Sequence, residues 1–174
     1  AYNNEKVVGE AINAWLAKTK TDRSKLWITS KVISADEPGP AAICDKSLEA
    51  LGCQYLDLFL VHTPFKATGK PFTRSLMEIW REMESLVDAG KVRTIGVSNW
   101  RIEDLEQIYD QARIKPCCNQ VEAHPYLQQP KLKKWCEDHK ILMTSYRPQA
   151  SLREKDLMGG PVDAVVAAAA KKYG

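Results

Sequence analysis

The sequence predicts an α/β fold, and among such folds it favours an incomplete (β/α)8 TIM barrel. Short apolar runs rich in strand-forming residues alternate with longer runs of helical period, which is the pattern of repeated strand-helix units. The residues that end five successive strands are 31, 36, 22 and 26 positions apart, close to the length of a parallel βαβ repeat. No Gly-x-Gly-x-x-Gly motif follows a predicted strand, which argues against a doubly wound dinucleotide-binding sheet. The strand ends are Lys31, His62, Ser98, Gln120 and Tyr146.

The composition is that of a globular domain with a core, because 44% of the residues are hydrophobic and 27% are charged. The 25 Lys and Arg residues nearly balance the 22 Asp and Glu residues, so we expect no nucleic-acid and no membrane partner. No apolar run approaches the roughly 18 residues of a membrane span, and no secretory signal opens the chain. The five cysteines have no disulfide or zinc spacing, which indicates reduced thiols in a cytoplasmic protein. Since there is no linker, residues 1–174 are expected to form a single domain.

The first half of the chain predicts two helices and two strands. The first helix is expected to be capped by Asn3 or Asn4 and to bury one apolar face. A strand follows at 26–31, and the next helix is expected to close near Gly52. Residues 55–61 then form a strand that is apolar on both faces, so we expect it to be buried on both sides up to His62. The expected inward residues of the helices are Val7, Val8, Ala11, Ile12, Trp15 and Leu16, then Cys44, Leu48 and Leu51.

The second half continues the alternation. Ser75 and Glu78 have the spacing of a capping box, and Gly90 is expected to end the helix that they begin. Pro130 and Pro161 stand where helices accept proline, at their first turn. The predicted elements are helices at 76–87 and 102–109 and from Pro130 and Pro161, and strands at 94–97, 117–122 and 141–146.

Three residue types at the strand ends suggest proton-transfer chemistry. A lysine beside a tyrosine favours the phenolate, so the tyrosine becomes a better proton donor at neutral pH. Lys31 lies at a strand end, Tyr146 ends the last strand and Tyr2 precedes the first helix. A histidine such as His62 can orient a carbonyl oxygen by hydrogen bonding. Cys136 and His139 lie three residues apart, but they have no third ligand at usable spacing, so we expect no metal site.

Six short motifs follow one another along the chain at regular spacing. They are Tyr2-Asn3-Asn4-Glu5 with Val8-Gly9-Glu10-Ala11-Ile12; Thr29-Ser30-Lys31; Leu56-Asp57-Leu58 with His62-Thr63-Pro64; Gly90-Lys91-Val92-Arg93; Ile95-Gly96-Val97-Ser98-Asn99; and Asn119-Gln120-Val121-Glu122-Ala123-His124-Pro125-Tyr126. In these motifs and in their order the chain resembles the aldo-keto reductases, which are NAD(P)H-dependent carbonyl reductases built on a (β/α)8 barrel. Six motifs in order are far more specific than any one of them.

The resemblance implies a role for each strand-end residue. Tyr2 corresponds to the acid that protonates the substrate oxygen, Lys31 to the lysine that lowers its pKa, and His62 to the histidine that orients the carbonyl. Ser98, Asn99 and Gln120 correspond to the residues that hydrogen-bond the nicotinamide carboxamide, and Tyr146 to the ring that stacks on the nicotinamide. The implied reaction is reduction of an aldehyde or ketone to an alcohol, with hydride from the nicotinamide and a proton from Tyr2. The implied cofactor is NADPH, with NADH equally compatible, and the implied partner is a small carbonyl substrate.

The chain also departs from the family pattern. By resemblance it corresponds to the third through seventh strands, so the aspartate partner of the lysine and the 2′-phosphate site of the cofactor would lie outside it. Thr63 stands where many members have tryptophan, and Arg147 opens a segment that is commonly Ser-Pro-Leu-Gly. We expect a barrel open at both edges to fold poorly by itself.

Two other functions are compatible with the sequence. One is a barrel lyase or aldolase in which Lys31 forms a Schiff base with a carbonyl substrate. The other is a non-catalytic regulatory or structural protein with this fold, because a fold by itself does not determine function.

Overall fold

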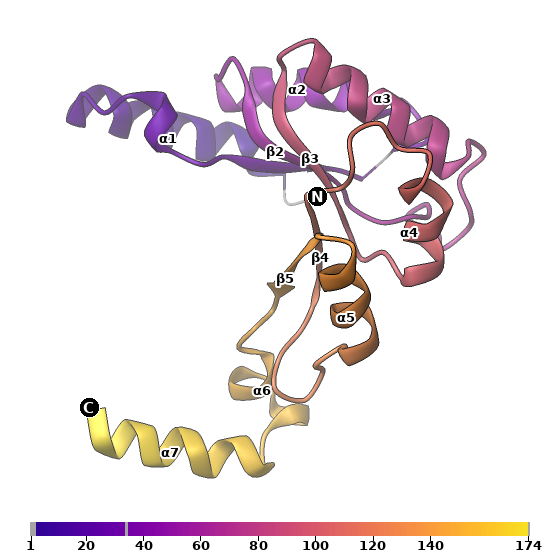
Figure 1. Cartoon of the computed structure of the whole chain (residues 1–174). Coiled ribbons are helices and arrows are strands. Elements are labelled where there is room, and N and C mark those ends of the chain that lie inside the picture. The colour runs from indigo at the N-terminus through magenta and orange to yellow at the C-terminus, as the bar shows by residue number, and fades with distance from the viewer. Residues whose placement is uncertain (1–2, 34, 174) are drawn as a thin grey trace. The chain divides into compact units, whose positions relative to one another are not determined.

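A computed structural model describes residues 3–33 and 35–173 (Figure 1). Helices and strands alternate along the chain, as predicted, and the chain divides into two compact units, Ala1–Asn119 and Gln120–Gly174. The elements are α1 (Glu5–Thr19), η1 (Arg23–Lys25), β1 (Thr29–Val32), α2 (Pro40–Leu51), β2 (Leu56–Val61), α3 (Leu76–Asp88), β3 (Val92–Ser98), α4 (Ile102–Tyr109), β4 (Cys118–Glu122), α5 (Pro130–Asp138), β5 (Leu142–Tyr146), α6 (Ala150–Arg153), η2 (Lys155–Leu157) and α7 (Pro161–Tyr173).

The strands follow the chain order β1-β2-β3-β4-β5 in the sheet. In the first unit β1, β2 and β3 are parallel, and their register places Lys31 opposite Leu60 and Leu60 opposite Gly96. All residues of β2 except Leu58 are buried, which confirms the prediction of a strand covered on both faces. Because the strands are parallel, their carboxyl ends lie at one edge of the sheet.

Helix α3 supplies much of the core of the first unit. It starts with the predicted capping box, in which the Glu78 amide donates to Ser75 Oγ at 3.2 Å and the Ser75 amide donates to Glu78 Oε2 at 2.8 Å. It ends before Gly90, whose φ of 69° is readily adopted by glycine. The buried side chains of α3 include Ile79, Trp80, Met83 and Leu86. In Figure 1, α2 and α3 lie together along one side of the strands.

β2 contains a buried carboxylate, Asp57, whose burial was not predicted from the sequence. Asp57 is 1% exposed, and its Oδ2 atom accepts hydrogen bonds from Arg23 Nη2 at 2.8 Å and from the Ile28 amide at 2.9 Å. Arg93 Nη1 lies 3.2 Å from Oδ1. Both guanidinium groups also contact the Tyr55 ring, at 4.3 and 4.1 Å from its centroid. The charge of Asp57 is thus compensated by two cations, as burial of a carboxylate requires.

Three predictions about the helices and β1 were wrong in detail. The expected apolar face of α1 is not buried, because Gly9 is its only buried residue among those described and the Val7 and Trp15 side chains are 67% and 46% exposed. Asn4 precedes the helix without a side-chain capping bond. β1 begins at Thr29 and leaves Trp27 exposed. The exposure of Trp27 and of the α1 side chains has a shared physical reason, because β1 is an edge strand in the part of the chain that the structure describes, with no strand beyond it to bury these side chains.

The second unit contains β5, α5, α6 and α7 and most of β4. The Ala123 amide donates to the Tyr146 carbonyl at 3.2 Å, which joins the end of β4 to the end of β5. α5 begins at Pro130, as predicted, and buries Leu132 and Cys136. α7 begins at Pro161, also as predicted, but none of its described residues is buried.

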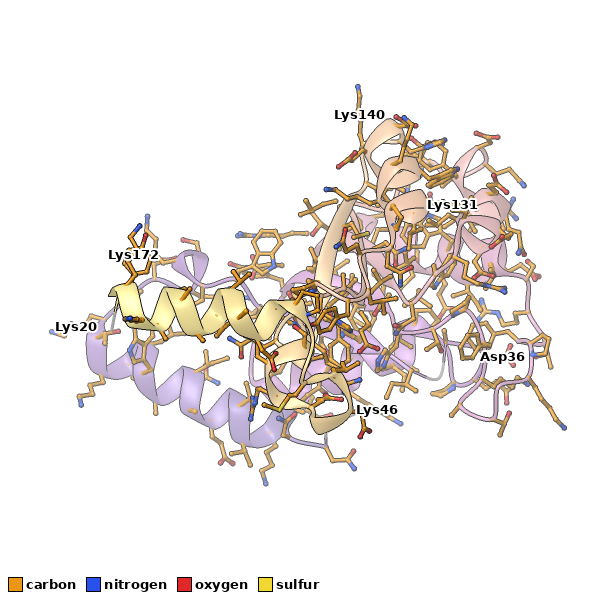
Figure 2. All side chains as sticks on the ribbon, turned by 90° about the horizontal axis from the view of Figure 1, so that it is seen from below. Lys20, Asp36, Lys46, Lys131, Lys140 and Lys172 are labelled. Atoms are coloured by element: carbon orange, nitrogen blue, oxygen red, sulfur yellow. The ribbon has the colours of Figure 1, made fainter. Side chains whose placement is uncertain are left out.

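Several lysine side chains of both units are exposed. In Figure 2 the labelled lysines Lys20, Lys46, Lys131 and Lys140 project from the ribbon, and each is exposed. Among the residues that the structure describes, no helix is both long and apolar enough to cross a membrane.

Candidate active site

Lys31 and His62 lie at the carboxyl ends of two adjacent parallel strands. Lys31 is the next-to-last residue of β1, and His62 directly follows β2, where its amide donates to the Val32 carbonyl at 2.9 Å. Both side chains are half-buried. The sheet register therefore brings together two residues that are 31 positions apart in the sequence.

The two side chains have lowered pKa values for related reasons. Burial lowers the pKa of Lys31, because a buried ammonium loses hydration. Burial also lowers the pKa of His62, and the nearby positive charge of Lys31 lowers it further. His62 is therefore neutral at pH 7. Its Nδ1 atom is buried and has no hydrogen-bond partner among the described residues.

Ser98 and Asn99 end the third strand beside His62. Asn99 has a φ of 61°, in the left-handed region, and this turn allows its Nδ2 to donate to the His62 carbonyl at 2.9 Å and to Ser98 Oγ at 3.2 Å. Ser98 is buried at the end of β3. The first unit thus places an ammonium, an imidazole, a hydroxyl and a carboxamide at one edge of the sheet.

Asn119 is a structural support of this edge that the sequence analysis did not identify. It is 0% exposed, and its amide accepts from the Trp100 N–H at 3.4 Å and donates to the Trp100 carbonyl at 2.8 Å. These two bonds fix the backbone of Trp100, the residue that follows Asn99. A polar side chain in an otherwise buried strand was visible in the sequence, but its partner lies 19 residues away in the sequence.

Gln120 and Tyr146 belong to the second unit, at β4 and at the end of β5. The Tyr146 side chain is 42% exposed. Arg147, which follows it, forms ion pairs with Glu122, at 3.0 Å, and with Glu154. Arg147, where the sequence departs from the family pattern, therefore has its charge paired with two carboxylates of its own unit.

Two further expectations concern Tyr2 and metal binding. Tyr2 lies outside the described residues. Among the residues that are described, no cluster of three or more His, Cys, Asp or Glu side chains could hold a metal ion. The His139 ring stacks on the Trp135 ring with the centroids 3.7 Å apart.

Parallel strand-helix units with polar residues at the strand ends define a protein of the α/β class. Within that class, residues 1–164 match the family model described as "Aldo/keto reductase family", so the chain belongs to this family and the predicted resemblance is confirmed.

Curated relatives and solved structures agree with this assignment. Aldose reductase B of Dictyostelium discoideum is 37% identical over 167 residues, which cover 84% of this chain and 54% of the relative. The NADP-dependent D-sorbitol-6-phosphate dehydrogenase of Malus domestica is 36% identical over 194 residues, covering 99% and 63%. The aldose reductase structure from Schistosoma japonicum superposes with a TM-score of 0.85 at 29% identity, covering 98% of this chain and 60% of that one.

The chain thus spans between half and two thirds of the length of these relatives. The matching aldose reductase structures are (β/α)8 barrels, and the five parallel strands correspond to part of one, which confirms the predicted fold class.

Proposed function

We propose that this chain contributes to an NAD(P)H-dependent reductase that converts an aldehyde or ketone to an alcohol. The observation that carries the proposal is the pair Lys31 and His62, half-buried at neighbouring strand ends with lowered pKa values. Perturbed titratable groups at the carboxyl ends of barrel strands are typical of active sites.

In the proposed reaction His62 is neutral and donates a hydrogen bond to the carbonyl oxygen of the substrate. Tyr2 protonates that oxygen as it gains negative charge, and the ammonium of Lys31 lowers the pKa of Tyr2 and so assists the transfer. Burial leaves the Lys31 ammonium weakly hydrated, which lowers its own pKa and also strengthens its electrostatic effect on a neighbouring phenol.

The residues that the family resemblance assigns to the nicotinamide carry suitable polar and aromatic groups. A carboxamide needs both a donor and an acceptor, and the Ser98 hydroxyl and the amides of Asn99 and Gln120 supply both. The partly exposed Tyr146 ring offers a flat surface for stacking. When bound, a reduced nicotinamide supplies the hydride. NADPH is the proposed cofactor, because two relatives carry names that specify NADP or NADPH, and NADH remains an alternative to be tested.

The test is a titration of the full-length protein with NADPH and with NADH, followed by nicotinamide fluorescence. Tyr146→Ala should weaken binding by about tenfold or more, because loss of aromatic stacking on a flat ring costs on the order of 1–3 kcal/mol. Tyr173→Ala, which removes a tyrosine that is 78% exposed, is the matched control and should leave binding unchanged. A well-folded protein that binds neither cofactor would refute the proposal.

A Schiff-base lyase is the second candidate, because the lowered pKa of Lys31 also suits a nucleophilic amine. Borohydride reduction in the presence of a carbonyl substrate distinguishes the two functions. A stable adduct on Lys31 would favour the lyase, whereas the reductase gives alcohol product without any adduct.

A further inference from the structure

The loop between β2 and α3 (residues 62–75, here the β2–α3 loop) folds into a small hairpin just after His62. The Lys66 amide donates to the Lys70 carbonyl at 2.9 Å, and the Gly69 amide donates to the Lys66 carbonyl at 2.8 Å. Phe65 and Pro71 pair as an antiparallel bridge. These bonds are all local, so they shape the hairpin without attaching it to the sheet.

Asp36, in the connection after β1, makes that attachment. It is 7% exposed, and its carboxylate accepts from the Thr73 amide at 3.0 Å, from the Thr73 hydroxyl at 2.8 Å and from the Arg74 amide at 3.0 Å. Its Oδ2 atom also lies 2.8 Å from Lys66 Nζ. One carboxylate thus holds both arms of the hairpin, because Lys66 is on the first arm and Thr73 is on the second.

The ion pair with Lys66 is the main cause that lowers the pKa of Asp36 well below its ordinary value, and the amide donors contribute as well. The carboxylate is therefore ionised at any pH at which the protein would be assayed. Figure 2 labels Asp36 in the first unit.

The base of the loop has a separate attachment. Arg74 Nη1 lies 2.7 Å from Glu82 Oε2 on α3, and Glu82 Oε1 accepts from the Ala41 amide at the start of α2 at 2.9 Å. These contacts do not involve Asp36. Removing the Asp36 carboxylate should therefore release the hairpin while the base of the loop stays in place.

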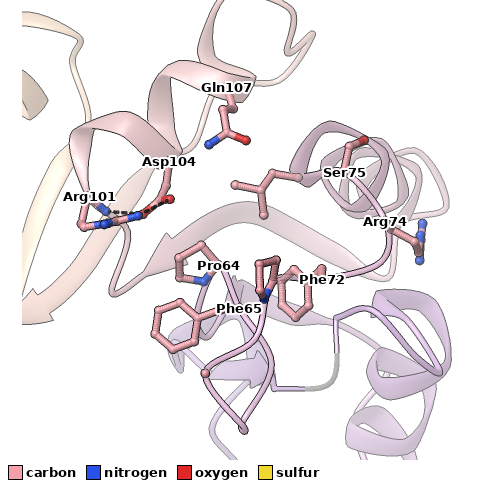
Figure 3. A pocket seen from close by; sticks show the side chains of 11 residues that line it. Pro64, Phe65, Phe72, Arg74, Ser75, Arg101, Asp104 and Gln107 are labelled. Atoms are coloured by element: carbon pink, nitrogen blue, oxygen red, sulfur yellow. Dashed lines mark hydrogen bonds and ion pairs between the residues drawn. The ribbon is translucent and has the colours of Figure 1, made fainter.

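The loop also forms one wall of a pocket of about 440 Å³ (Figure 3). Phe65 and Phe72 line it from the loop, and the Arg101–Asp104 ion pair lines it from the start of α4. A movement of the hairpin would change the width of this pocket, and it would also shift the chain that directly follows His62. In barrels of this kind the loops at the carboxyl ends of the strands shape the substrate site.

We propose that Asp36 is a positioning residue, which holds the β2–α3 loop beside the strand ends and thereby selects which carbonyl substrates reach His62. The holding of the loop follows from the contacts alone, whereas the selection of substrates rests on the proposed reductase function. Aromatic aldehydes should depend on Asp36 more than small aliphatic ones, because only the larger molecules would reach the Phe65 and Phe72 rings.

Hydrogen exchange of the full-length protein tests the holding of the loop without any assay of activity. In Asp36→Ala, amides in 66–74 should exchange about tenfold faster or more, because several hydrogen bonds to one charged acceptor are lost. Asp36→Asn should show a smaller increase, since its amide oxygen still accepts from the backbone. Asp45→Asn, which removes an exposed carboxylate paired with Lys91, is the matched control and should change nothing.

Exchange in 56–61, the buried β2 strand, reports whether each variant is folded. If β2 remains protected and exchange in 66–74 is unchanged in both Asp36 variants, the holding role is wrong. Lys66→Met provides a second variant that leaves the buried carboxylate in place, and it should accelerate exchange less than Asp36→Ala does.

Steady-state kinetics test the selection of substrates. The ratio of kcat/KM for benzaldehyde to that for propanal should fall about tenfold in Asp36→Ala, with the Kd for NADPH within about twofold of the wild-type value. An unchanged ratio together with faster exchange would overturn the selection. A wild-type protein that reduces no carbonyl compound would instead refute the reductase function, and the exchange result would still decide whether Asp36 holds the loop.

Discussion

At the scale of single residues, Lys31 influences the titration of His62 because the parallel register places the two residues at neighbouring strand ends. Lys31 is still protonated when His62 titrates, so its charge opposes protonation of the imidazole. Burial acts in the same direction on both groups. A neutral imidazole keeps one ring N–H, so it can donate a hydrogen bond to a carbonyl oxygen without carrying a positive charge.

The lowered pKa of His62 predicts a pH dependence of stability. In the unfolded chain His62 has a pKa near its ordinary value of 6.5, whereas in the folded protein its pKa is lower. Between these two values the unfolded state binds the additional proton, so stability decreases as the pH falls through 6.5 and levels off below the folded pKa. Urea unfolding of the full-length protein at pH 7.5 and pH 5.5 measures this effect.

His62→Gln is the comparison, because it keeps a polar side chain and removes the titration. The variant should lose less stability than the wild type between the two pH values, since the carboxylates contribute equally to both proteins. Equal losses would contradict the lowered pKa of His62.

At the scale of elements, Gly9 determines how closely α1 approaches α2. A Cβ atom at this position would lie 2.6 Å from the Leu51 Cα and carbonyl oxygen atoms, and backbone atoms cannot move aside as a flexible side chain can. Polar contacts fix the same interface, since Asn13 Nδ2 donates to the Leu51 carbonyl at 3.1 Å and Ser47 Oγ donates to Glu5 Oε2 at 3.1 Å. The two helices are held together mainly by close backbone approach and hydrogen bonds.

Gly9→Ala should therefore destabilise the protein although alanine is the better helix former. The gain in helix propensity is about 1 kcal/mol, and the overpacking against Leu51 should cost on the order of 1–3 kcal/mol, so we expect a net loss in the midpoint of urea unfolding. Ala17→Gly, at an exposed position of the same helix, should cost about 1 kcal/mol from propensity alone. An increase in stability for Gly9→Ala would show that the helices do not approach as closely as described.

At the scale of the whole molecule, the exposed apolar side chains of α1 and α7 are the main feature. Val7 is 67% exposed and Val165 is 69% exposed, and neither helix buries an apolar face within its own unit. Helices in proteins gain most of their stability from packing one face against other elements. Residues 1–174 by themselves leave those faces without a partner among the described elements.

We therefore expect the isolated chain of residues 1–174 to show no cooperative thermal transition by circular dichroism and to bind a hydrophobic dye. A sharp thermal transition of the isolated chain, with no added segment, would contradict this prediction.

Much of the fold could be predicted because its signals are local. The apolar run before His62 predicted β2, the Ser75–Glu78 spacing predicted the capping box, and Pro130 and Pro161 predicted two helix starts. The strand-end positions of Lys31, His62, Ser98 and Tyr146 were likewise predicted from where apolar runs end, whereas Gln120 lies in the middle of β4. The burial of α1 was predicted wrongly, because a helical pattern shows which face is apolar but not whether another element covers that face.

The sequence by itself determined the order of helices and strands, the family, and the residues that stand at the carboxyl ends of the strands, because each of these depends on neighbouring residues or on short motifs. Only the tertiary structure showed that Asn119 supports Trp100 and that Asp36 holds Thr73, which lies 37 residues away. Such pairs arise from the register of parallel strands and the course of the loops that follow them. A hydrogen bond between distant residues leaves no periodic or local signal in the chain, and therefore it becomes visible only when the strands are side by side.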